Sequence, residues 1–451
     1  MVKQSLSYYL DILLKEHPEQ VFRYREEVQK DYFLTSLVME MDKRRNSRVV
    51  ILENIKGSKI PVVGNLFSSR KRIAAMLGCN IDSFPEKWMK AENNLLDPAI
   101  VKNGPVRDNI IIGEDVDLFR LPISYHFNDD AGPYITSAIL VARDPDSGVY
   151  NLSFHRLQLK GKNKFGVSLH SRGHLWDYFR RAEEKRTDLP VAVIVGCHPL
   201  MYLAAASKMS MDIDEYSLAG SLMEEPLCLT PGSSCGLLVP AASEIVLEGK
   251  ILANVREAEG PLGEYTGYST SRSTENVFIV DAIMNRNNPY FLDIVPGNSS
   301  EHLLLGGIAK EIHIMERLRE AVPALINVNF PRSGTHFHAY LSIKKTDRGQ
   351  AKQALMLLLG LDHYVKLAIA VDEDIDIFNE EEVLWAVATR VQADRDVFII
   401  PDVICNKLDP SSREGISAKM GIDATIPLNR GIVRCRTNKK TDFMIKDILE
   451  N

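Results

Sequence analysis

The segment ITSAILVARDPDSGVYNLSFHRLQLKG, residues 135–161, contains the strand pairing on which the fold depends. Two runs rich in β-branched and aromatic residues flank Pro145-Asp-Ser-Gly148, a combination typical of a hairpin turn. A predicted helix, WDYFRRAEEKRTDLP (176–190), and a predicted buried strand, PVAVIVG (190–196), come next. These residues therefore predict paired strands combined with helices, which is a mixed α/β fold.

The chain on either side continues this alternation. Residues 1–20 predict an amphipathic helix with a buried leucine stripe, RVVILENI and IPVVGNLF predict strands, and a helix is expected near Ser69. Residues 302–322 have helical periodicity and predict a connection between two domains, with a boundary near residue 320. Beyond it, strands alternate with predicted helices around 351–359 and through Trp385, as in a compact α/β unit. The leucine stripe consists of Leu6, Leu10, Leu13 and Leu14.

The composition is that of an ordinary globular protein. The 451 residues suffice for two domains, with 45% hydrophobic and 25% charged residues and no apolar stretch of membrane-spanning length. A net charge of −6 argues against a nucleic-acid partner, and the basic residues 434–440 are interpreted as a solvated end. The amino terminus does not resemble a secretory signal, so a cytoplasmic location with reduced thiols is expected. The six cysteines lack CxxC spacing: Cys79, Cys197, Cys228, Cys235, Cys405 and Cys435.

The segment EAEGPLGEYTGY, residues 257–268, is the strongest candidate for chemistry. Two carboxylates, Glu259 and Glu264, lie five residues apart in a turn rich in glycine, which lets a backbone approach a ligand closely. Burial can divide such a pair into an ionised carboxylate and a protonated acid. The alternative is a solvent-exposed turn with two ordinary surface glutamates.

A second candidate is Arg156, on the predicted strand that follows the hairpin turn. By strand parity it shares a face with Leu152 and Phe154, and a guanidinium among apolar neighbours needs an anionic partner. The alternative is an exposed arginine on an edge strand. Asn151 falls on the opposite face, so both side chains line one site only if the strand bulges or a cofactor wraps around its end.

Two further patterns have the spacing of metal ligands. His170 and His174 lie four residues apart, which places two imidazoles on one face if the segment is helical, although Gly173 weakens a helix there. Polar residues at a helix start are the alternative. The acidic run 372–376 lacks the glycine and terminal glutamate of a calcium loop, and we interpret it as a strand end.

Taken in order, these segments resemble the UbiD family of decarboxylases along nearly the whole chain. The run EGPLGEYTGY after VPAASEIVLEG is the most specific part of the resemblance. The other matching segments are SYYLDILLKE, PVVGNL, YITSAILVARDPDSGVYNLSFHRLQLKG, DEYSLAGSL, VDEDIDIFNEEEVLWAVATR and NKLDPSS.

The resemblance implies an architecture and a catalytic trio. It implies an amino-terminal cofactor domain with a split-barrel-like sheet over 1–302, a linking helix over 303–321 and a carboxy-terminal α/β oligomerisation domain over 322–430, followed by a tail over 431–451. A homodimer or homohexamer is expected. The family's catalytic arginine and two glutamates fall on Arg156, Glu259 and Glu264.

The resemblance also implies prenylated FMN as the cofactor, supplied by a UbiX-type flavin prenyltransferase. Its modified ring accepts electron density as carbon dioxide leaves, while the protein orients the substrate and moves protons. Glu264 would protonate the carbon that loses carbon dioxide, and an Arg156–Glu259 ion pair would tune the flavin and position the acid.

The same resemblance implies ions that hold the cofactor phosphate. The metal, Mn²⁺ or Mg²⁺, would bind Asn151, His170 and Glu215, with His174 as a rival for His170. A K⁺ ion would lie near backbone oxygens around Ser207 and Met209. Further cofactor contacts would come from Ser153 and Lys366.

The resemblance implies a small carboxylic acid as substrate, and residues 295–307, VPGNSSEHLLLGG, resemble the branch of the family that acts on furan, pyrrole or indole carboxylates. His302 would then face the substrate, and Lys310 stands where that branch often has an arginine for a second carboxylate. The expected activity is reversible non-oxidative decarboxylation of an unsaturated, aromatic or heteroaromatic acid. Alternatives are decarboxylation of a phosphorylated aliphatic acid in isoprenoid synthesis, flavin reduction, or a flavin-carrier subunit.

Overall fold

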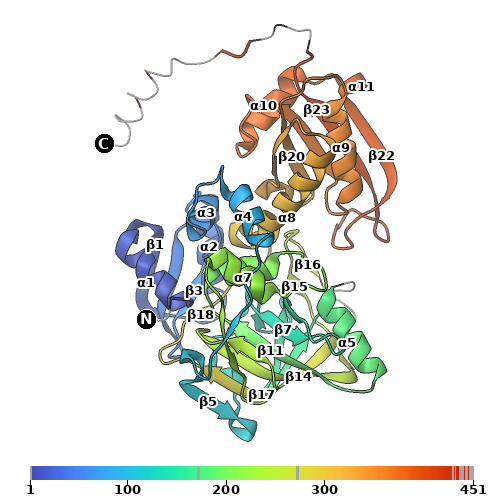
Figure 1. The fold of residues 1–451 in the computed structure, drawn as a ribbon. Helices are drawn as coiled ribbons and strands as arrows, with labels where there is room; N and C mark the ends of the chain where they lie inside the picture. Colours follow the sequence, from blue (N-terminus) through green and yellow to red (C-terminus); the bar gives the residue numbers. More distant parts are fainter. Residues whose placement is uncertain are drawn as a thin grey trace. The chain divides into compact units, whose positions relative to one another are not determined.

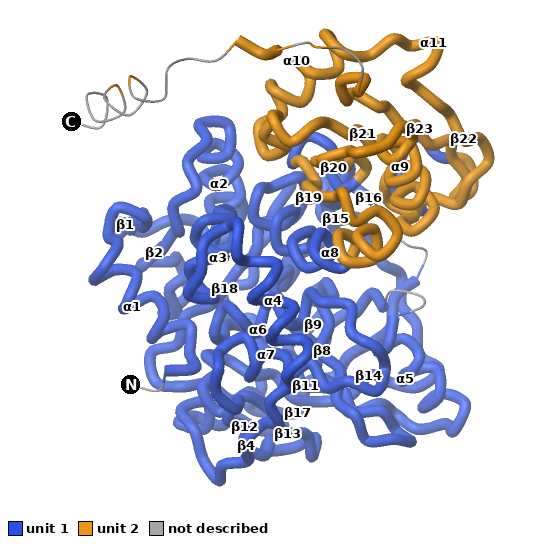
Figure 2. The backbone as a smooth tube through the Cα atoms, turned by 45° about the horizontal axis from the view of Figure 1, so that its top comes forward, with its two compact units in different colours: residues 1–313, 332–336, 407–412 blue, residues 314–331, 337–406, 413–451 orange. Residues whose placement is uncertain are grey.

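The computed structural model describes residues 3–169, 173–270 and 274–428, together with 431, 433–435, 441 and 445. They form two compact units, the first of residues 1–313, 332–336 and 407–412 and the second of residues 314–331, 337–406 and 413–451 (Figure 2). The predicted mixed α/β class is confirmed (Figure 1). The division falls inside helix α8 (Ser300–Ala321), between His313 and Ile314. The predicted domain limits at 302, 321 and 430 stay predictions.

A large antiparallel sheet forms the centre of the first unit. Each of its strands pairs with its neighbours in the antiparallel sense, and short β5 (Asn109–Ile112) pairs with the middle of the sheet at β17. In spatial order the remaining strands are β6 (Tyr134–Ile135), β9 (Leu157–Gly161), β10 (Lys164–Val167), β17 (Glu275–Asn285), β14 (Ile245–Glu257), β11 (Leu189–Val195), β7 (Ile139–Arg143) and β8 (Tyr150–Phe154).

The predicted hairpin is confirmed between β7 and β8. The carboxylate of Asp144 accepts the backbone N–H of Asp146 at 2.8 Å, and Gly148 has a φ of +80°, a conformation that favours glycine. One part of the strand prediction was wrong, because residues 149–161 do not form a single strand. They separate at His155 and Arg156 into β8 and β9, which lie at different positions in the sheet.

Both faces of the large sheet are buried, as alternating side chains show. On β7, Ile139 and Val141 join the cluster that contains residues of α6 (Pro199–Ala206) and α7 (Glu215–Met223). Leu140 and Ala142 join the cluster that contains residues of α5 (His174–Glu184). Period-two alternation thus sends successive residues into two cores, one on each side of the sheet.

The amino-terminal region adds a smaller sheet to the first unit. Its predicted first helix is confirmed as α1 (Leu6–Glu16), in which Leu6, Leu10 and Leu13 are buried and Leu14 is partly buried. The helix predicted near Ser69 is α3 (Arg70–Met76), and the Ser69 hydroxyl caps it by accepting the N–H of Arg72. The remaining elements here are β1 (Val21–Val28), β2 (Val49–Ile55), β3 (Val62–Gly64), β18 (Phe291–Leu292), α2 (Phe33–Lys43) and α4 (Phe84–Glu92).

Two short sheets complete the first unit. One consists of β13 (Leu238–Pro240), β12 (Cys228–Pro231) and β4 (Ala99–Ile100). The other is the pair β15 (Leu262–Gly263) and β16 (Ser269–Thr270), which closes the glycine-rich turn singled out above.

The second unit is an α/β sandwich of its own. The acidic run ends a strand as predicted, since β21 stops at Asp372, and Arg390 binds Asp372 and Asp374 at 2.8 Å each. Separate apolar clusters lie around α9 (Gln350–Leu361) and α10 (Glu380–Arg390), and α11 (Ala393–Asp396) precedes the last two strands. The sheet order is β19 (Leu325–Asn329), β20 (His338–Ile343), β21 (Leu367–Asp372), β23 (Ile416–Ala424) and β22 (Val397–Ile404).

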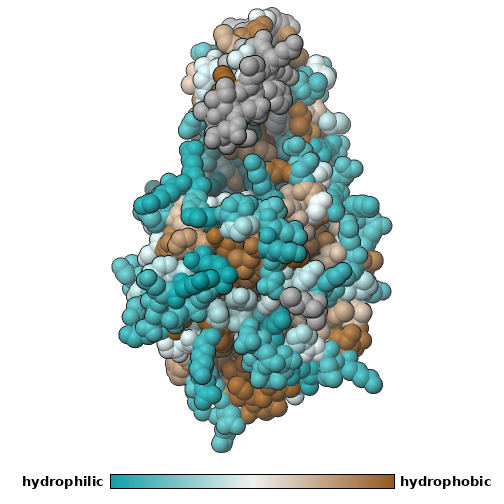
Figure 3. Space-filling view, turned by 90° about the vertical axis from the view of Figure 1, so that its left-hand side faces the viewer, coloured by the Kyte–Doolittle hydropathy of each residue, from teal (hydrophilic) through white to brown (hydrophobic). Residues whose placement is uncertain are grey.

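The surface shown in Figure 3 is mainly hydrophilic, with smaller hydrophobic areas between charged side chains. None of the helices in the described ranges is both long and apolar enough to cross a membrane. The six cysteines carry free thiols, in agreement with the expectation of reduced cysteines.

Candidate active site

The structure brings Arg156, Glu259 and Glu264 into direct contact. The Arg156 Nε donates to Glu259 Oε1 at 2.8 Å, its Nη2 lies 2.6 Å from the same oxygen, and its Nη1 is paired with Glu264 Oε1. The Glu259 side chain is fully buried, while 12% of the Arg156 side chain and 18% of the Glu264 side chain are exposed. The alternative of two ordinary surface glutamates is therefore wrong. Glu264 is the carboxyl of the pair that remains accessible to a small molecule.

The electrostatics of the trio favour a permanently charged arginine. Burial alone would lower the pKa of Arg156, but the negative charges of Glu264 and Glu259 outweigh it and raise that pKa. Two carboxylates and one guanidinium carry one excess negative charge when both carboxylates are ionised. Removing one partner of such a buried pair typically costs about 3–5 kcal/mol, because the other charge is left uncompensated.

The turn that carries the two glutamates is held by close backbone packing. Glu264 accepts the N–H of Gly267 at 2.8 Å through its carbonyl, and its own N–H donates to the carbonyl of Tyr268 at 2.9 Å. A Cβ on Gly260 would lie 1.8 Å from the Cβ of Ala131, so only glycine fits there. The Ala131 N–H also donates to the carbonyl of Pro261 at 2.9 Å. The glycines therefore let the turn lie against residues 127–134.

We expect Gly260→Ala to destabilise the protein by about 1–3 kcal/mol, because the new methyl forces either the turn or residue 131 to move. Chemical denaturation followed by circular dichroism measures this change. Gly360→Ala is the matched control, since that helical glycine has open space around it. The control variant should be as stable as the wild type or slightly more stable. Equal stability of Gly260→Ala and wild type would show that the turn is not tightly packed.

A tyrosine that the sequence did not single out lies beneath the turn. The Tyr134 hydroxyl donates to the carbonyl of Gly260 at 3.2 Å, and its side chain is almost completely buried. Burial raises the pKa of Tyr134 well above its ordinary value, with Arg156 opposing and nearby carboxylates adding to the shift. Tyr134 is therefore a neutral donor that fixes the position of the glycine turn.

Two of the predicted metal ligands, Asn151 on β8 and Glu215 at the start of α7, also lie close together. The Asn151 amide lies 3.1 Å from Glu215 Oε1 and 3.4 Å from His174 Nδ1, and Glu215 Oε2 accepts the N–H of Leu152 at 3.0 Å. His174 Nδ1 is 4.0 Å from Glu215 Oε1. Of the two rival histidines, His174 is thus placed beside Asn151 and Glu215. His170 lies outside the described residues, and α5 begins at His174.

This cluster suits a divalent cation. Burial raises the pKa of Glu215 to about 8, partly offset by its hydrogen bonds, and lowers the pKa of His174. A cation favours the ionised carboxylate and the neutral imidazole, so it would stabilise Glu215 in the form that burial disfavours. A half-turn of the Asn151 amide would direct its oxygen toward the same point. Within the described residues, groups of three or more His, Cys, Asp or Glu with metal-site geometry are absent, and an asparagine completes this set.

Ser153 links the metal-type cluster to the strand break. Its hydroxyl contacts Asn151 Oδ1 at 3.2 Å and His155 Nε2 at 3.1 Å, and His155 Nδ1 lies 3.0 Å from the Ser168 carbonyl. Strand parity predicts that alternate residues point to one side of the strand. The contacts among Asn151, Ser153 and His155 agree with this prediction. Because the chain leaves β8 before Arg156, that arginine reaches the glycine turn instead of continuing the alternation.

The predicted substrate residues lie on α8. His302 Nδ1 is 2.9 Å from the carbonyl of Gly297, and burial lowers the pKa of its imidazole despite that bond and the charge of Glu264. Lys310 follows His302 by eight residues, roughly two helical turns, on a similar face. A residue that sequence reasoning missed, His336, packs edge-on against Tyr265, with ring centroids 5.5 Å apart.

The remaining predicted cofactor residues have structural partners. The Ser207 hydroxyl donates to Glu92 Oε1 at 3.3 Å and lies 3.5 Å from the sulfur of Met209, just after α6 ends. Lys366 belongs to the second unit, where its ammonium lies 5.6 Å from the centre of the Phe337 ring. The K⁺ site and the role of Lys366 stay predictions.

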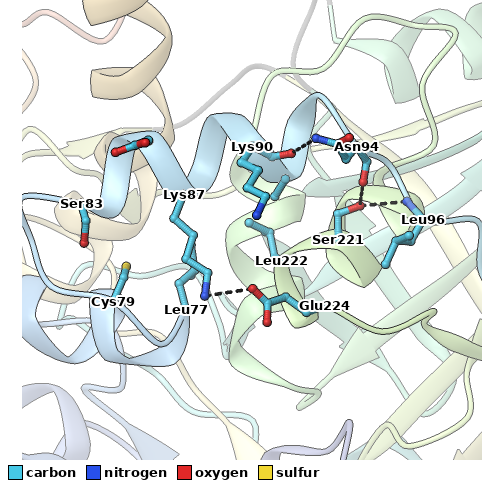
Figure 4. Close-up of a pocket in the computed structure, with 12 residues that line it drawn as sticks. Leu77, Cys79, Ser83, Lys87, Lys90, Asn94, Leu96, Ser221, Leu222 and Glu224 are labelled. Carbon is cyan, nitrogen blue, oxygen red and sulfur yellow. Dashed lines mark hydrogen bonds and ion pairs between the residues drawn. The ribbon is translucent and has the colours of Figure 1, made fainter.

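A surface pocket of about 570 Å³ lies elsewhere, between α3, α4 and α7 (Figure 4). Lys87 pairs with Glu224 at 3.0 Å in it, and Ser221 lines the same wall. Glu224 follows the end of α7, while Glu215 begins that helix, so the pocket and the metal-type cluster lie at opposite ends of α7.

Three consecutive domains of one family match the chain. They are the 3-octaprenyl-4-hydroxybenzoate carboxy-lyase N-terminal domain over residues 12–92, the Rift-related domain over 99–299 and the C-terminal domain over 303–424. The chain belongs to the UbiD family. The resemblance seen in the sequence is thus confirmed, and the protein is a UbiD-type carboxy-lyase.

The curated relatives of this UbiD protein differ in their substrates. Anhydromevalonate phosphate decarboxylase of Methanothermobacter thermautotrophicus is 35% identical, over 91% of this chain and 95% of its own. Phenolic acid decarboxylase of Bacillus subtilis is 33% identical, over 85% of this chain and 84% of its own. The comparisons therefore show a decarboxylase and leave the substrate class open.

Solved UbiD structures share the whole fold. The UbiD-class enzyme HmfF from Pelotomaculum thermopropionicum, in complex with FMN, is 41% identical and has a TM-score of 0.93 over 98% of this chain and 99% of that one. An evolved dimeric form of the same enzyme, in complex with prenylated FMN, is 39% identical and has a TM-score of 0.89, over 97% and 99% of the two chains.

Proposed function

We propose that this UbiD protein catalyses reversible non-oxidative decarboxylation of an unsaturated, aromatic or heteroaromatic carboxylic acid with prenylated FMN. The observation that carries the proposal is the contact of Arg156 with both Glu259 and Glu264, together with a cation-type cluster that includes Asn151 of the preceding strand. A buried arginine that holds two carboxylates suits proton transfer in a site from which water is largely excluded. The complexes of HmfF with FMN and prenylated FMN support the choice of cofactor.

Each member of the trio has a distinct role in this proposal. Glu264, the more accessible carboxyl, delivers a proton to the carbon that loses carbon dioxide, and in the reverse direction it removes that proton. Glu259, fully buried, remains the permanent partner of Arg156. Arg156 orients Glu264 through Nη1 and presents its remaining surface to the cofactor or the substrate carboxylate.

Prenylated FMN, when bound, supplies the electron sink for decarboxylation. Asn151, His174 and Glu215 would hold the cation that binds its phosphate, with His170 as the rival ligand, and Ser153 lies beside them. Ser207, Met209 and Lys366 are proposed as further contacts, with K⁺ near the first two. A UbiX-type flavin prenyltransferase would supply the cofactor.

His302 and Lys310 decide between substrate classes in this proposal. A neutral imidazole at His302 suits a heteroaromatic ring or hydroxyl group as a hydrogen-bond partner, and the charge of Glu264 acts on that imidazole. The second candidate substrate, a phosphorylated aliphatic acid, is favoured by the anhydromevalonate phosphate decarboxylase relative. An ammonium at Lys310 pairs with a phosphate or with a carboxylate.

Coexpression with a flavin prenyltransferase, followed by a substrate panel, tests the proposal. The panel contains furan-2-carboxylate, pyrrole-2-carboxylate, indole-3-carboxylate, 4-hydroxybenzoate and anhydromevalonate phosphate. We expect carbon dioxide release from at least one ring acid, and retention of a flavin with the mass of prenylated FMN. Release from anhydromevalonate phosphate alone would favour the second substrate class. Flavin reduction without carbon dioxide release from any acid would contradict the proposal.

A further inference from the structure

A third glutamate lies beside the trio, and neither the sequence motifs nor the proposed reaction uses it. Glu275 is the first residue of β17 and is only 2% exposed. Its carboxylate lies directly over Gly166 of β10, where a Cβ would come within 1.9 Å of Glu275 Oε1. Glycine at 166 therefore makes room for a buried carboxyl in the middle of the sheet.

The carboxylate of Glu275 pairs with a lysine on β9, the strand that follows Arg156 in the chain. Lys160 is paired with Glu275 Oε1, and its ammonium donates to the carbonyl of Ala258 at 2.6 Å, one residue before Glu259. The carbonyl that Lys160 binds belongs to the residue next to Glu259, and the Glu259 carboxylate binds Arg156. The pair Lys160–Glu275 thus lies behind the pair Arg156–Glu259.

Other charged groups also act on Glu275 or on its partner Lys160. Glu257, its cross-strand partner on β14, lies 3.6 Å from Lys160 and is itself neutralised by Lys164 at 2.7 Å. Glu259 and Arg156 act on Glu275 electrostatically with opposite signs, and Glu275 in turn acts on Tyr134. Burial outweighs the attraction of Lys160 and raises the pKa of Glu275 to about 7.

We infer that Glu275 is a positioning residue for the proton donor, Glu264. Together with Lys160, Glu275 forms a charge pair behind Arg156 and Glu259 whose net charge changes with pH. This pair extends the activity of Glu264 to higher pH. This inference rests on the proposed function. When Glu275 is protonated, it no longer offsets the Lys160 charge, which then acts more strongly on the carboxylates of the trio. When Glu275 is ionised, its negative charge cancels that of Lys160 and favours a proton on Glu264.

The first test needs neither substrate nor cofactor. Because the folded state holds the Glu275 proton up to about pH 7 and the unfolded chain releases it near 4.5, the wild type loses stability as pH rises through this window. The Glu275→Gln variant has no ionisable group at this position, so it does not lose stability with rising pH in this way. In urea unfolding of the two purified proteins, the unfolding constant of the wild type relative to Glu275→Gln should rise on the order of a hundredfold between about pH 5 and about pH 8.

The second test measures pH profiles of kcat for the holoenzymes with pyrrole-2-carboxylate. Glu275→Gln should move the descending limb to lower pH by about one unit and leave KM nearly unchanged. Glu257→Gln, a change of the same chemical kind on the partner strand, should leave the profile in place. Lys160→Gln removes the cation. The descending limb of its kcat profile should therefore lie at higher pH than that of the wild type.

The outcomes separate the inference from the proposed function. A pH-dependent stability difference without any decarboxylation would leave the buried charge pair intact and refute the proposed activity. Superimposable pH profiles of wild type and Glu275→Gln, in active enzymes, would overturn the inference. If Glu275→Gln fails to fold, Lys160→Gln carries the test, and an unchanged profile in that variant overturns the inference as well.

Discussion

Glu264→Gln should reduce kcat for decarboxylation by at least about a hundredfold while the flavin stays bound. Glutamine keeps the length of the side chain and its oxygen still accepts from Arg156 Nη1, so the turn retains its anchor. The amide cannot deliver a proton to carbon, and proton delivery is the step assigned to this residue. Single-turnover kinetics with the cofactor-loaded variant, together with its visible absorption spectrum, separate loss of chemistry from loss of flavin.

The matched control for this substitution is Glu114→Gln, which makes the same chemical change at an exposed glutamate just after β5. The control should keep wild-type kcat, KM and flavin content. Full activity of Glu264→Gln would assign the proton to another group. Loss of flavin from that variant would instead make Glu264 a structural residue of the cofactor site.

Local sequence patterns predicted the elements whose signal is contained within a few residues. The hairpin between β7 and β8 follows from Asp144 and Gly148, and the first helix follows from its leucine spacing. The glycine turn was recognised because Glu259 and Glu264 lie five residues apart among glycines that let a backbone approach a ligand closely. In each case the residues that determine the structure are close neighbours in the chain.

The sequence could not show where the strand after the hairpin breaks. Residues 149–161 are continuously strand-like, yet β8 ends before His155 and Arg156, and His155 contacts the Ser168 carbonyl at 3.0 Å. That break allows Asn151 and Arg156 to serve neighbouring sites despite their opposite parity. The interaction involves a residue 13 positions away, which no local pattern reports.

Tyr134 and Glu275 were missed for a similar reason. They join the trio only because β6, β9, β10 and β17 lie side by side in the large sheet, although residues 134 and 275 are far apart in sequence. Gly166, an isolated glycine in a strand-like run, is the single local sign of a close approach there. Sheet order, and not local composition, therefore determines the surroundings of the catalytic trio.

The second large effect concerns the cation-type cluster. Glu215→Gln should abolish high-affinity Mn²⁺ binding and lower flavin retention by about tenfold or more, because the variant loses the anionic member of the ligand set. The amide still accepts from the Leu152 N–H, so the fold of α7 and β8 is maintained. Elemental analysis and flavin absorbance after gel filtration measure the two losses in the same sample.

The same assignment predicts how Mn²⁺ affinity changes with pH. Without a cation the pKa of Glu215 is about 8, so at lower pH a metal must displace a proton. Mn²⁺ affinity should therefore rise about tenfold per pH unit up to about pH 8 and level off above it, in titrations of the flavin-free protein. Glu224→Gln, at the other end of α7 and exposed, should follow the wild-type curve. A flat curve for the wild type would exclude Glu215 as a ligand, since a buried carboxyl that gains a metal must first lose its proton.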